Sequence, residues 1–277
     1  MFICFVLIIL ELCKNSDLMT FGEDINKNLE VCMATKGHKT ADLMKYYRSI
    51  ENAQLHERAA YKKKIELLLL TTLFHHYPNL EIENLICESP DFIININGRQ
   101  IGLEVSEIIN HFELKKRENF INVVFRDVEA ELQSYNSLCG MYYLDIDYTD
   151  PLIFTNQSRF TKDILSAITN NKKTRFVKNI RRTPYPKGVL LFLEYRFSLF
   201  DELDSEKILE VIEKKNAKYP LYHSNAEECW LLLVSNMYNV SSRYSFIQSQ
   251  ERLQSVQSPF SKILHVENLH RGLLVIK

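Results

Sequence analysis

The dipeptide Asn97-Gly98 constrains the fold of this 277-residue chain more than any other sequence feature. It joins two apolar, strand-like runs, residues 91–96 and 99–106. A two-residue turn of type I′ requires positive φ at both central residues, and asparagine and glycine tolerate this best. We therefore predict a β-hairpin whose register is set by these two turn residues.

This register places two carboxylates opposite each other. Counting back from the turn, Asp91 on the first strand faces Glu104 on the second. Directly opposed like charges destabilise a strand pair by up to about 1 kcal/mol. A divalent cation removes that repulsion, because Mg²⁺ is typically held by one or two carboxylates together with water and substrate phosphates. The alternative is that the acids lie on a wet sheet face, where Arg99 or a lysine neutralises them.

Side chains alternate along strands and so sort the hairpin into two faces. One face is entirely apolar, and we expect it to cover a core. Its residues are Phe92, Ile94, Ile96, Ile101, Leu103 and Val105. The other face is mostly polar, so it can hold water, substrate or metal. Its residues are Asp91, Ile93, Asn95, Gln100, Gly102, Glu104 and Ser106.

The remaining chain alternates between helix-like and strand-like patterns. A first helix is predicted from about 42 to 77, with Pro78 ending it, and its apolar face is Ile65, Leu68, Leu69, Thr72 and Leu73. A second lies within 110–136, with an apolar stripe of Phe120, Val123, Val124, Val128 and Leu132. Further helices are predicted at 157–170 and 204–219, and strands at 141–148, 188–195, 229–236, 260–267 and 272–277. This alternation predicts an α/β (α+β) fold with a central mixed β-sheet flanked by helices.

Composition limits the domain organisation and the compartment. With 46% hydrophobic residues, the chain suffices for one large domain, predicted at 44–277 after an N-terminal extension, 1–43. Lys and Arg total 34 against 35 Asp and Glu, so net charge argues neither for nor against a polyanionic partner. The six cysteines form no Cys-x-x-Cys pair, which disfavours zinc and disulfides and favours a reducing cytoplasm.

The N-terminal run MFICFVLIIL is the strongest apolar segment. No basic residue precedes it, and it is shorter than the roughly 20 apolar residues that cross a bilayer. We expect no membrane span and favour a buried or misannotated extension, with Met19, Met33 and Met44 as alternative starts. A membrane anchor formed by residues 1–12 is the competing interpretation.

Residues 164–193 contain no Asp or Glu but many basic residues, interleaved with Phe176 and Tyr185. Clustered basic groups bind a phosphate backbone by releasing its counterions, and aromatic rings stack on bases. We therefore predict a nucleic-acid contact here. Its basic residues are Lys172, Lys173, Arg175, Lys178, Arg181, Arg182 and Lys187. The alternative is a solvated loop balanced by acids that lie nearby in space.

The motif Pro90-Asp91, the hairpin turn and the run Glu104-Val105-Ser106 together resemble the PD-(D/E)xK nuclease superfamily, which has the restriction-endonuclease-like fold. The resemblance covers about residues 57–135. It implies a core in the order helix, three strands, helix, strand. The third strand would then be the one near 141–148 or the one near 188–195.

By resemblance, Asp91 and Glu104 are ligands of Mg²⁺ or Mn²⁺, and the reaction is cleavage of a phosphodiester bond. Glu66, on the preceding helix, is a third candidate metal ligand, since a core-helix glutamate serves this role in some family members. Glu88 and Glu107 are weaker candidates.

Ser106 departs from the family pattern, because it stands where the family has a lysine that helps to activate the attacking water. Some members recruit this lysine from another element. The lysines that we consider for that role are Lys63, Lys64, Lys214 and Lys215. The candidate catalytic set is Asp91, Glu104, Ser106 and Lys215.

The expected function is thus a Mg²⁺-dependent endonuclease acting on DNA rather than RNA. The alternative is a catalytically silent nuclease-fold module that binds nucleic acid or a protein partner. A homodimer stays open.

Overall fold

The structure is a computed structural model. It describes residues 40–109, 112–147, 150–186, 188–194, 201–202, 205–235, 240–242, 244–245, 253, 256–267 and 272–277. The expected extension 1–43 lies outside the described residues except at its last four positions, as do the apolar run at the N-terminus and Lys187.

The chain divides into two compact units, whereas the sequence predicts one domain from 44 to 277. The described part of unit 1 lies within His111–Leu199, and that of unit 2 lies within Ser16–Asn110 and Phe200–Lys277. Because unit 2 uses chain on both sides of unit 1, unit 1 is an insertion in its sequence. Each unit is described by itself below.

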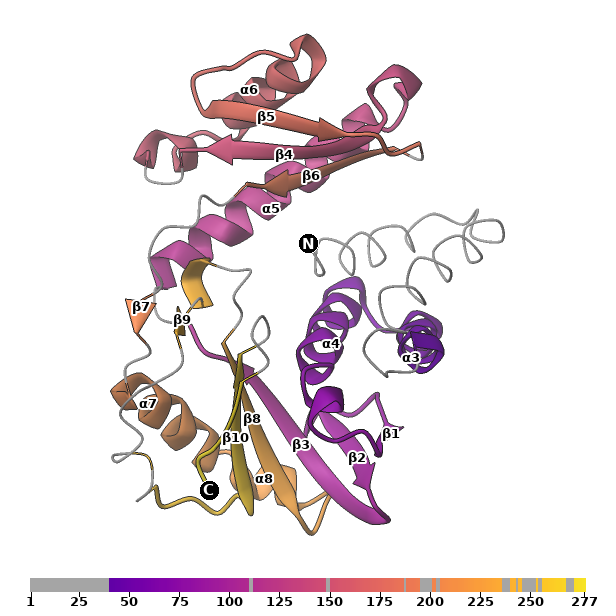
Figure 1. The fold of residues 1–277 in the computed structure, drawn as a ribbon, viewed down its shortest axis with the longest axis vertical. Coiled ribbons are helices and arrows are strands. Elements are labelled where there is room, and N and C mark those ends of the chain that lie inside the picture. Colours follow the sequence, from indigo (N-terminus) through magenta and orange to yellow (C-terminus); the bar gives the residue numbers. More distant parts are fainter. Residues whose placement is uncertain are drawn as a thin grey trace. The chain divides into compact units, whose positions relative to one another are not determined.

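Unit 2 contains a six-stranded mixed sheet in the order β1-β2-β3-β8-β10-β11 (Figure 1). Its strands are β1 (Leu80–Asn84), β2 (Phe92–Ile96), β3 (Arg99–Glu107), β8 (Cys229–Ser235), β10 (Lys262–Glu267) and β11 (Leu273–Val275). Strands β1, β2 and β3 are antiparallel neighbours, while β8 runs parallel to β3 and to β10.

The helices of unit 2 precede and follow the hairpin in sequence. They are α3 (Thr40–Asn52), α4 (Glu57–Leu70), η1 (Leu73–His75), α7 (Ser205–Asn216), α8 (Tyr219–His223) and η4 (Val240–Ser242). Two short strands, β7 (Asp201–Glu202) and β9 (Tyr244–Ser245), pair separately.

The predicted hairpin is confirmed. Asn97 and Gly98 have φ values of 55° and 83°, as a type I′ turn requires. Ile96 pairs with Arg99 and Phe92 with Leu103, which is the register that the turn predicts. The third antiparallel strand is β1, which the sequence pattern does not predict.

Both faces of the unit 2 sheet are covered, so the expectation of an open polar face is wrong around Glu104. The apolar face packs against α3, α4 and η1, as expected, through Ile50, Leu67, Leu70 and Leu73. The opposite face packs against α7 and α8 through Ile208, Ile212 and Tyr222, and against Ala226 in the connection that follows α8. These side chains exclude solvent from much of the polar face and leave it exposed only toward the turn, at Gln100.

The predicted helix from 42 to 77 is two α-helices and a 3-10 turn, with Gln54 at φ 51° between α3 and α4. The buried face of α4 also differs from the predicted stripe. Lys63 and Glu66 are buried at 8% and 7% exposure, while Ile65 and Leu68 are only partly buried. The helix is therefore rotated relative to the prediction, and two charged residues face the sheet.

Unit 1 contains a three-stranded sheet in the order β5-β4-β6, with β4 antiparallel to β5 and parallel to β6. Its elements are α5 (Phe112–Leu132), η2 (Asn136–Leu138), β4 (Gly140–Ile146), η3 (Pro151–Phe154), α6 (Gln157–Asn170), β5 (Val177–Thr183) and β6 (Val189–Leu193). Both helices pack on the sheet through one apolar cluster. In α5 the predicted stripe is buried at Val124, Val128 and Leu132, but Val123 is exposed.

Two sheets flanked by helices confirm the predicted α+β class. The two segments considered for the third strand of the nuclease-like core, 141–148 and 188–195, correspond to β4 and β6 of unit 1, so neither joins the sheet that holds the hairpin. Among the described helices, none is both long and apolar enough to cross a membrane.

Candidate active site

Asp91 lies at the entry to β2 and is 4% exposed. Its Oδ2 accepts a hydrogen bond from the main-chain N–H of Val105 at 2.9 Å. Alternate residues of β3 present their N–H groups to β2, and the paired register of the two strands ends at Phe92 and Leu103, two residues before Val105. The carboxylate therefore supplies the acceptor at this place in the ladder, which fixes it at the edge of the strand pair.

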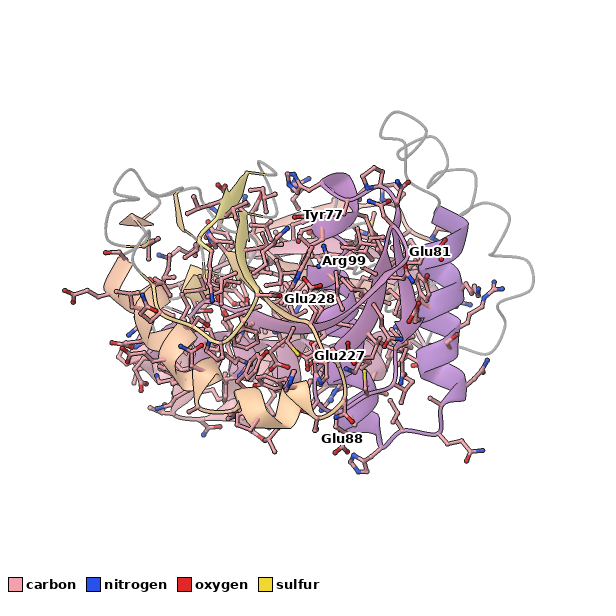
Figure 2. All side chains as sticks on the ribbon, turned by 90° about the horizontal axis from the view of Figure 1, so that it is seen from below. Tyr77, Glu81, Glu88, Arg99, Glu227 and Glu228 are labelled. Atoms are coloured by element: carbon pink, nitrogen blue, oxygen red, sulfur yellow. The ribbon has the colours of Figure 1, made fainter. Side chains whose placement is uncertain are left out.

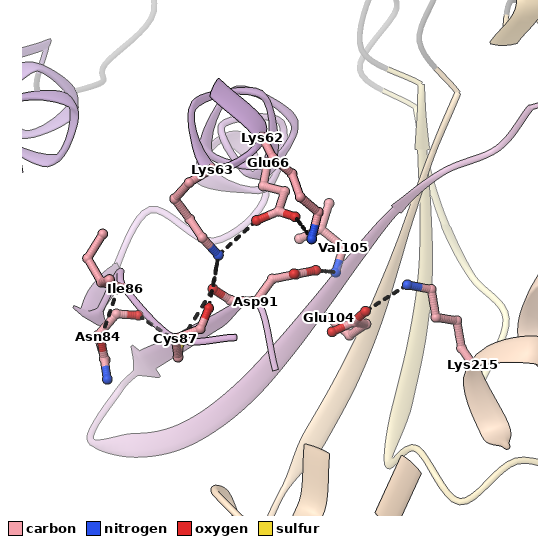
Figure 3. A network of polar contacts seen from close by, with 10 residues as sticks. All are labelled: Lys62, Lys63, Glu66, Asn84, Ile86, Cys87, Asp91, Glu104, Val105 and Lys215. Carbon is pink, nitrogen blue, oxygen red and sulfur yellow. Dashed lines mark hydrogen bonds and ion pairs between the residues drawn. The ribbon is translucent and has the colours of Figure 1, made fainter. Parts of the chain in front are cut away.

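Glu104 lies on β3, on the face covered by α7 and α8, and is 6% exposed. Its Oε1 accepts a hydrogen bond from Lys215 Nζ at 2.6 Å (Figure 3). Lys215 is in the last turn of α7, so the helix that covers this face also supplies an ammonium group. The other carboxylate oxygen, Oε2, is buried and accepts no hydrogen bond within the described part of the chain.

Glu66 comes from α4 and faces two lysines. Its Oε1 lies 2.9 Å from Lys62 Nζ and its Oε2 lies 2.8 Å from Lys63 Nζ. Burial raises the pKa of Glu66, but the hydrogen bonds from Lys63 and Lys62 outweigh this and hold it below its ordinary value. Glu66 is therefore an ionised group with both oxygens engaged.

Asp91 is electrostatically the most perturbed of the three acids. Burial raises its pKa to about 7, with further contributions from the negative charges of Glu104 and Glu66. These contributions put the three carboxylates in one electrostatic cluster, although they come from α4, the entry to β2, and β3. Near neutral pH the cluster holds a proton that a cation would displace.

Two carboxylate oxygens in the cluster are available to a ligand. No hydrogen bond from a described residue reaches Asp91 Oδ1, and Glu104 Oε2 is buried with no hydrogen-bond partner, although the Tyr222 hydroxyl is close enough to interact with Glu104. In the part of the chain that the structure describes, no group of three or more His, Cys, Asp or Glu side chains could hold a metal ion. A cation here would have two protein carboxylates, with water or substrate oxygens completing its shell, as Mg²⁺ accepts.

The lysines considered for the vacant motif position lie in different environments. Lys215 contacts Glu104 directly, whereas Lys214 is exposed on the same helix. Lys64 pairs with Glu51 at 2.9 Å. Ser106 is half-buried on β3, on the same face as Glu104.

The weaker ligand candidates lie elsewhere. Glu88 is exposed in the connection before β2. Glu107, at the end of β3, accepts a hydrogen bond from Ser242 Oγ at 2.6 Å.

Two residues near the acids are absent from the sequence-based set. Lys62 belongs to the cluster, because the hydrogen bond to Glu66 and then the charges of Glu66, Asp91 and Glu104 raise its pKa. Tyr222 of α8 is buried near Glu104, and burial followed by the charge of Glu104 raises its pKa. A tyrosine in a short apolar helix carries no sequence signal for such a place, since it equally suits a core.

A separate hollow of about 480 Å³ lies beside the hairpin turn of unit 2. Arg99 and Glu228 form an ion pair at 2.5 Å at this end of the unit, with Glu227 near them (Figure 2). The residues that line the hollow are Arg99, Gln100, His223, Ser224, Asn225, Ala226, Glu227 and Glu228. No candidate catalytic or metal-binding residue lines this hollow.

The predicted nucleic-acid contact forms the edge strand β5 of unit 1 and the connection before it. Lys172, Lys173 and Arg175 are exposed and make no ion pair with described residues. Lys178 pairs with Asp147 at 2.8 Å, and Arg181 lies 3.5 Å from Glu194.

Arg182 is engaged with the main chain, donating to the carbonyls of Ser137 and Cys139 at 3.1 and 2.7 Å. Nearby acids and carbonyls thus satisfy one part of the basic segment, as the alternative interpretation expects. Charged side chains on an edge strand also prevent unwanted strand pairing.

Comparisons of the chain with protein-family models, with curated proteins and with solved structures give no match.

Proposed function

We propose that this protein is a divalent-cation-dependent nuclease that hydrolyses phosphodiester bonds in nucleic acid, with DNA as the favoured substrate. The observation that carries the proposal is that Asp91 and Glu104 are both buried and close enough for the charge of Glu104 to raise the pKa of Asp91, while Glu104 Oε2 is buried with no hydrogen-bond partner among the described residues. A buried carboxylate oxygen without a donor is costly unless a ligand uses it.

The connectivity of unit 2 supports the proposal. Apart from the short elements η1, β7 and α8, its elements α4, β1, β2, β3, α7 and β8 follow in the order helix, three strands, helix, strand. This is the core order that the resemblance to PD-(D/E)xK nucleases implies, with unit 1 inserted between β3 and α7. The order is obtained with β1 as the first strand, so the hairpin supplies the second and third.

Lys215 is the residue that we assign to the vacant lysine position. Ser106 has no charge to offer, but the ammonium of Lys215 lies 2.6 Å from Glu104 Oε1. An ammonium there can stabilise the negative charge that develops on the phosphate during attack. Ser106 is then a spectator on β3.

Mg²⁺ or Mn²⁺ bound by Asp91 and Glu104 would polarise the scissile phosphate and lower the pKa of the attacking water. The chain's own residues prepare this position. The N–H of Val105 orients Asp91 and Lys215 orients Glu104, so hydrogen bonds hold the two acids in place although burial strengthens their repulsion. Removing either acid should therefore abolish cleavage and leave the sheet intact.

The basic residues of unit 1 are proposed to contact the phosphate backbone. Lys172, Lys173 and Arg175 are the strongest candidates, because no described carboxylate neutralises them. Each phosphate contact that is lost should reduce the slope of log binding constant against log salt concentration by about one.

The test is a cleavage assay with labelled single- and double-stranded DNA and RNA, with and without Mg²⁺ or Mn²⁺. The wild-type protein is compared with Asp91→Ala, Glu104→Ala and Glu88→Gln, an exposed acid that serves as a control. We expect metal-dependent cleavage that the first two variants lose and the third keeps. Cleavage that survives both site substitutions would refute the assignment.

The same assay addresses the alternative, a catalytically silent nuclease-fold module. The deep burial of both acids is the feature that favours it, since a silent site need not admit a substrate. Binding of nucleic acid without cleavage under every metal condition would support the silent module over the enzyme.

A further inference from the structure

Lys63 has a buried ammonium group with three acceptors. The residue is 8% exposed on α4. Its Nζ donates to the main-chain carbonyls of Asp91 at 2.8 Å and Cys87 at 3.2 Å, and it pairs with Glu66 Oε2 at 2.8 Å (Figure 3). An ammonium group has three N–H donors. Two of them serve the carbonyls, and the Glu66 carboxylate lies within ion-pair distance of the same ammonium group, so Lys63 is committed to the protein interior.

The two carbonyls bracket the connection between β1 and β2 that carries Asp91. Residues 87–91 belong to no helix or strand, so no ladder satisfies their main chain. Side chains do this instead, with Lys63 at both ends of the connection and Asn225 donating to Ser89 O at 2.6 Å in its middle. Buried carbonyl groups need such partners.

We propose that Lys63 is a positioning residue that fixes Asp91 for cation binding. Lys63 holds the main-chain oxygen of Asp91, and the N–H of Val105 holds its Oδ2. A residue anchored at both ends presents its remaining oxygen, Oδ1, in one direction, as a preorganised ligand must. This inference rests on the proposed function only where it says that Asp91 is oriented in order to bind a cation. The contacts that orient Asp91 do not depend on that function.

Lys62 is a matched control. It pairs with the same Glu66 at 2.9 Å, but its side chain is 73% exposed and it donates to neither carbonyl. Lys62→Met and Lys63→Met therefore each remove one positive charge and one contact with Glu66. Only Lys63→Met releases the connection that carries Asp91.

The first measurement is amide hydrogen exchange at Val105, whose N–H reports the bond to Asp91. Lys63 suppresses local opening of the chain at Asp91. In Lys63→Met this opening is no longer suppressed, so exchange at Val105 should be about tenfold faster than in the wild type, or more. The Ile101 amide, in the same hairpin, should change less than about twofold. Lys62→Met should leave both amides near the wild-type rate. Equal exchange at Val105 in all three proteins, or equal acceleration in both variants, would overturn the proposal.

The second measurement separates this inference from the proposed function. If the wild-type protein cleaves nucleic acid, Lys63→Met should lower kcat and leave KM near its wild-type value, since it disturbs a metal ligand and no substrate contact. If the wild-type protein cleaves nothing, the proposed function fails, but exchange at Val105 still decides the role of Lys63.

Lys63→Gln guards against loss of folding in the methionine variant. Glutamine keeps two N–H donors on a shorter side chain, so Val105 exchange should lie between those of the wild type and Lys63→Met. A folded Lys63→Gln with the wild-type exchange rate at Val105 and wild-type kcat would contradict the positioning role.

Discussion

Asp91→Asn should stabilise the metal-free protein at high pH and change its stability little at pH 5. The pKa of Asp91 is raised from 3.8 to about 7, so the folded state binds a proton that the unfolded state releases. Stability that depends on this proton is present at low pH and is lost as pH rises toward 7. Asparagine has no proton to lose and keeps an oxygen for the Val105 N–H.

The magnitude follows from the two pKa values. At pH 5 the wild-type protein has lost stability over the pH interval from 3.8 to 5, because buried Asp91 resists ionisation. Above pH 7 it has lost stability over the whole interval from 3.8 to about 7. The advantage of the variant should therefore grow by about two pKa units between pH 5 and pH 8, which is about 2.5 kcal/mol. A buried amide group that lacks an acceptor subtracts about 1–2 kcal/mol at both pH values.

The assay is urea unfolding of wild type and Asp91→Asn in EDTA at pH 5 and pH 8. Glu88→Gln removes an exposed negative charge and should stay within about 0.5 kcal/mol of wild type at both values. Adding Mg²⁺ at pH 8 should stabilise the wild type and leave Asp91→Asn nearly unchanged. A difference between wild type and Asp91→Asn that is the same at pH 5 and pH 8 would refute the electrostatic reasoning.

Two further substitutions test the packing and the charge around the site. Gly102→Ala should lower the free energy of unfolding by about 1–3 kcal/mol, because a Cβ there would lie 2.8 Å from side-chain atoms of both Ala226 and Pro90; a urea midpoint equal to wild type would contradict this. Lys215→Met should abolish cleavage yet tighten Mn²⁺ binding, because Glu104 loses its ammonium partner; calorimetry that shows weaker binding would argue for a structural role instead.

The hairpin could be predicted because its determinants are local. Asn97 and Gly98 select the turn, and the turn sets the register from the Ile96–Arg99 pair to the Phe92–Leu103 pair. Continued by one residue, this register puts Asp91 opposite Glu104. No information from distant parts of the chain is needed for any of these steps.

The buried face of α4 could not be predicted by the same means. Leu67 to Leu70 are four consecutive leucines, so an apolar stripe fits the helix in more than one phase. If charged residues are expected to face solvent, the helix phase chosen is the one that places Lys63 and Glu66 on the outer face. In the structure the two pair with each other, and Lys63 also satisfies main-chain carbonyls, which makes their burial affordable.

Non-local pairing explains the remaining errors. The strand that follows β3 in the sheet is β8, which comes after the inserted unit 1, so nearby strand-like segments are misleading candidates. Lys215 lies 111 positions from Glu104 in sequence, and only the packing of α7 across the sheet brings it close. The sequence supplies lysine candidates, and the choice among them needs the tertiary structure.

Direct measurement of metal binding tests the central claim most closely. Titration of Mn²⁺ into the wild-type protein, Asp91→Asn and Glu104→Gln, followed by calorimetry, reports both affinity and stoichiometry. The account predicts one ion per chain in the wild type and at least about tenfold weaker binding in each variant, which is a loss of about 1.4 kcal/mol. Mn²⁺ binding that is absent from the wild type, or unchanged in both variants, would contradict it.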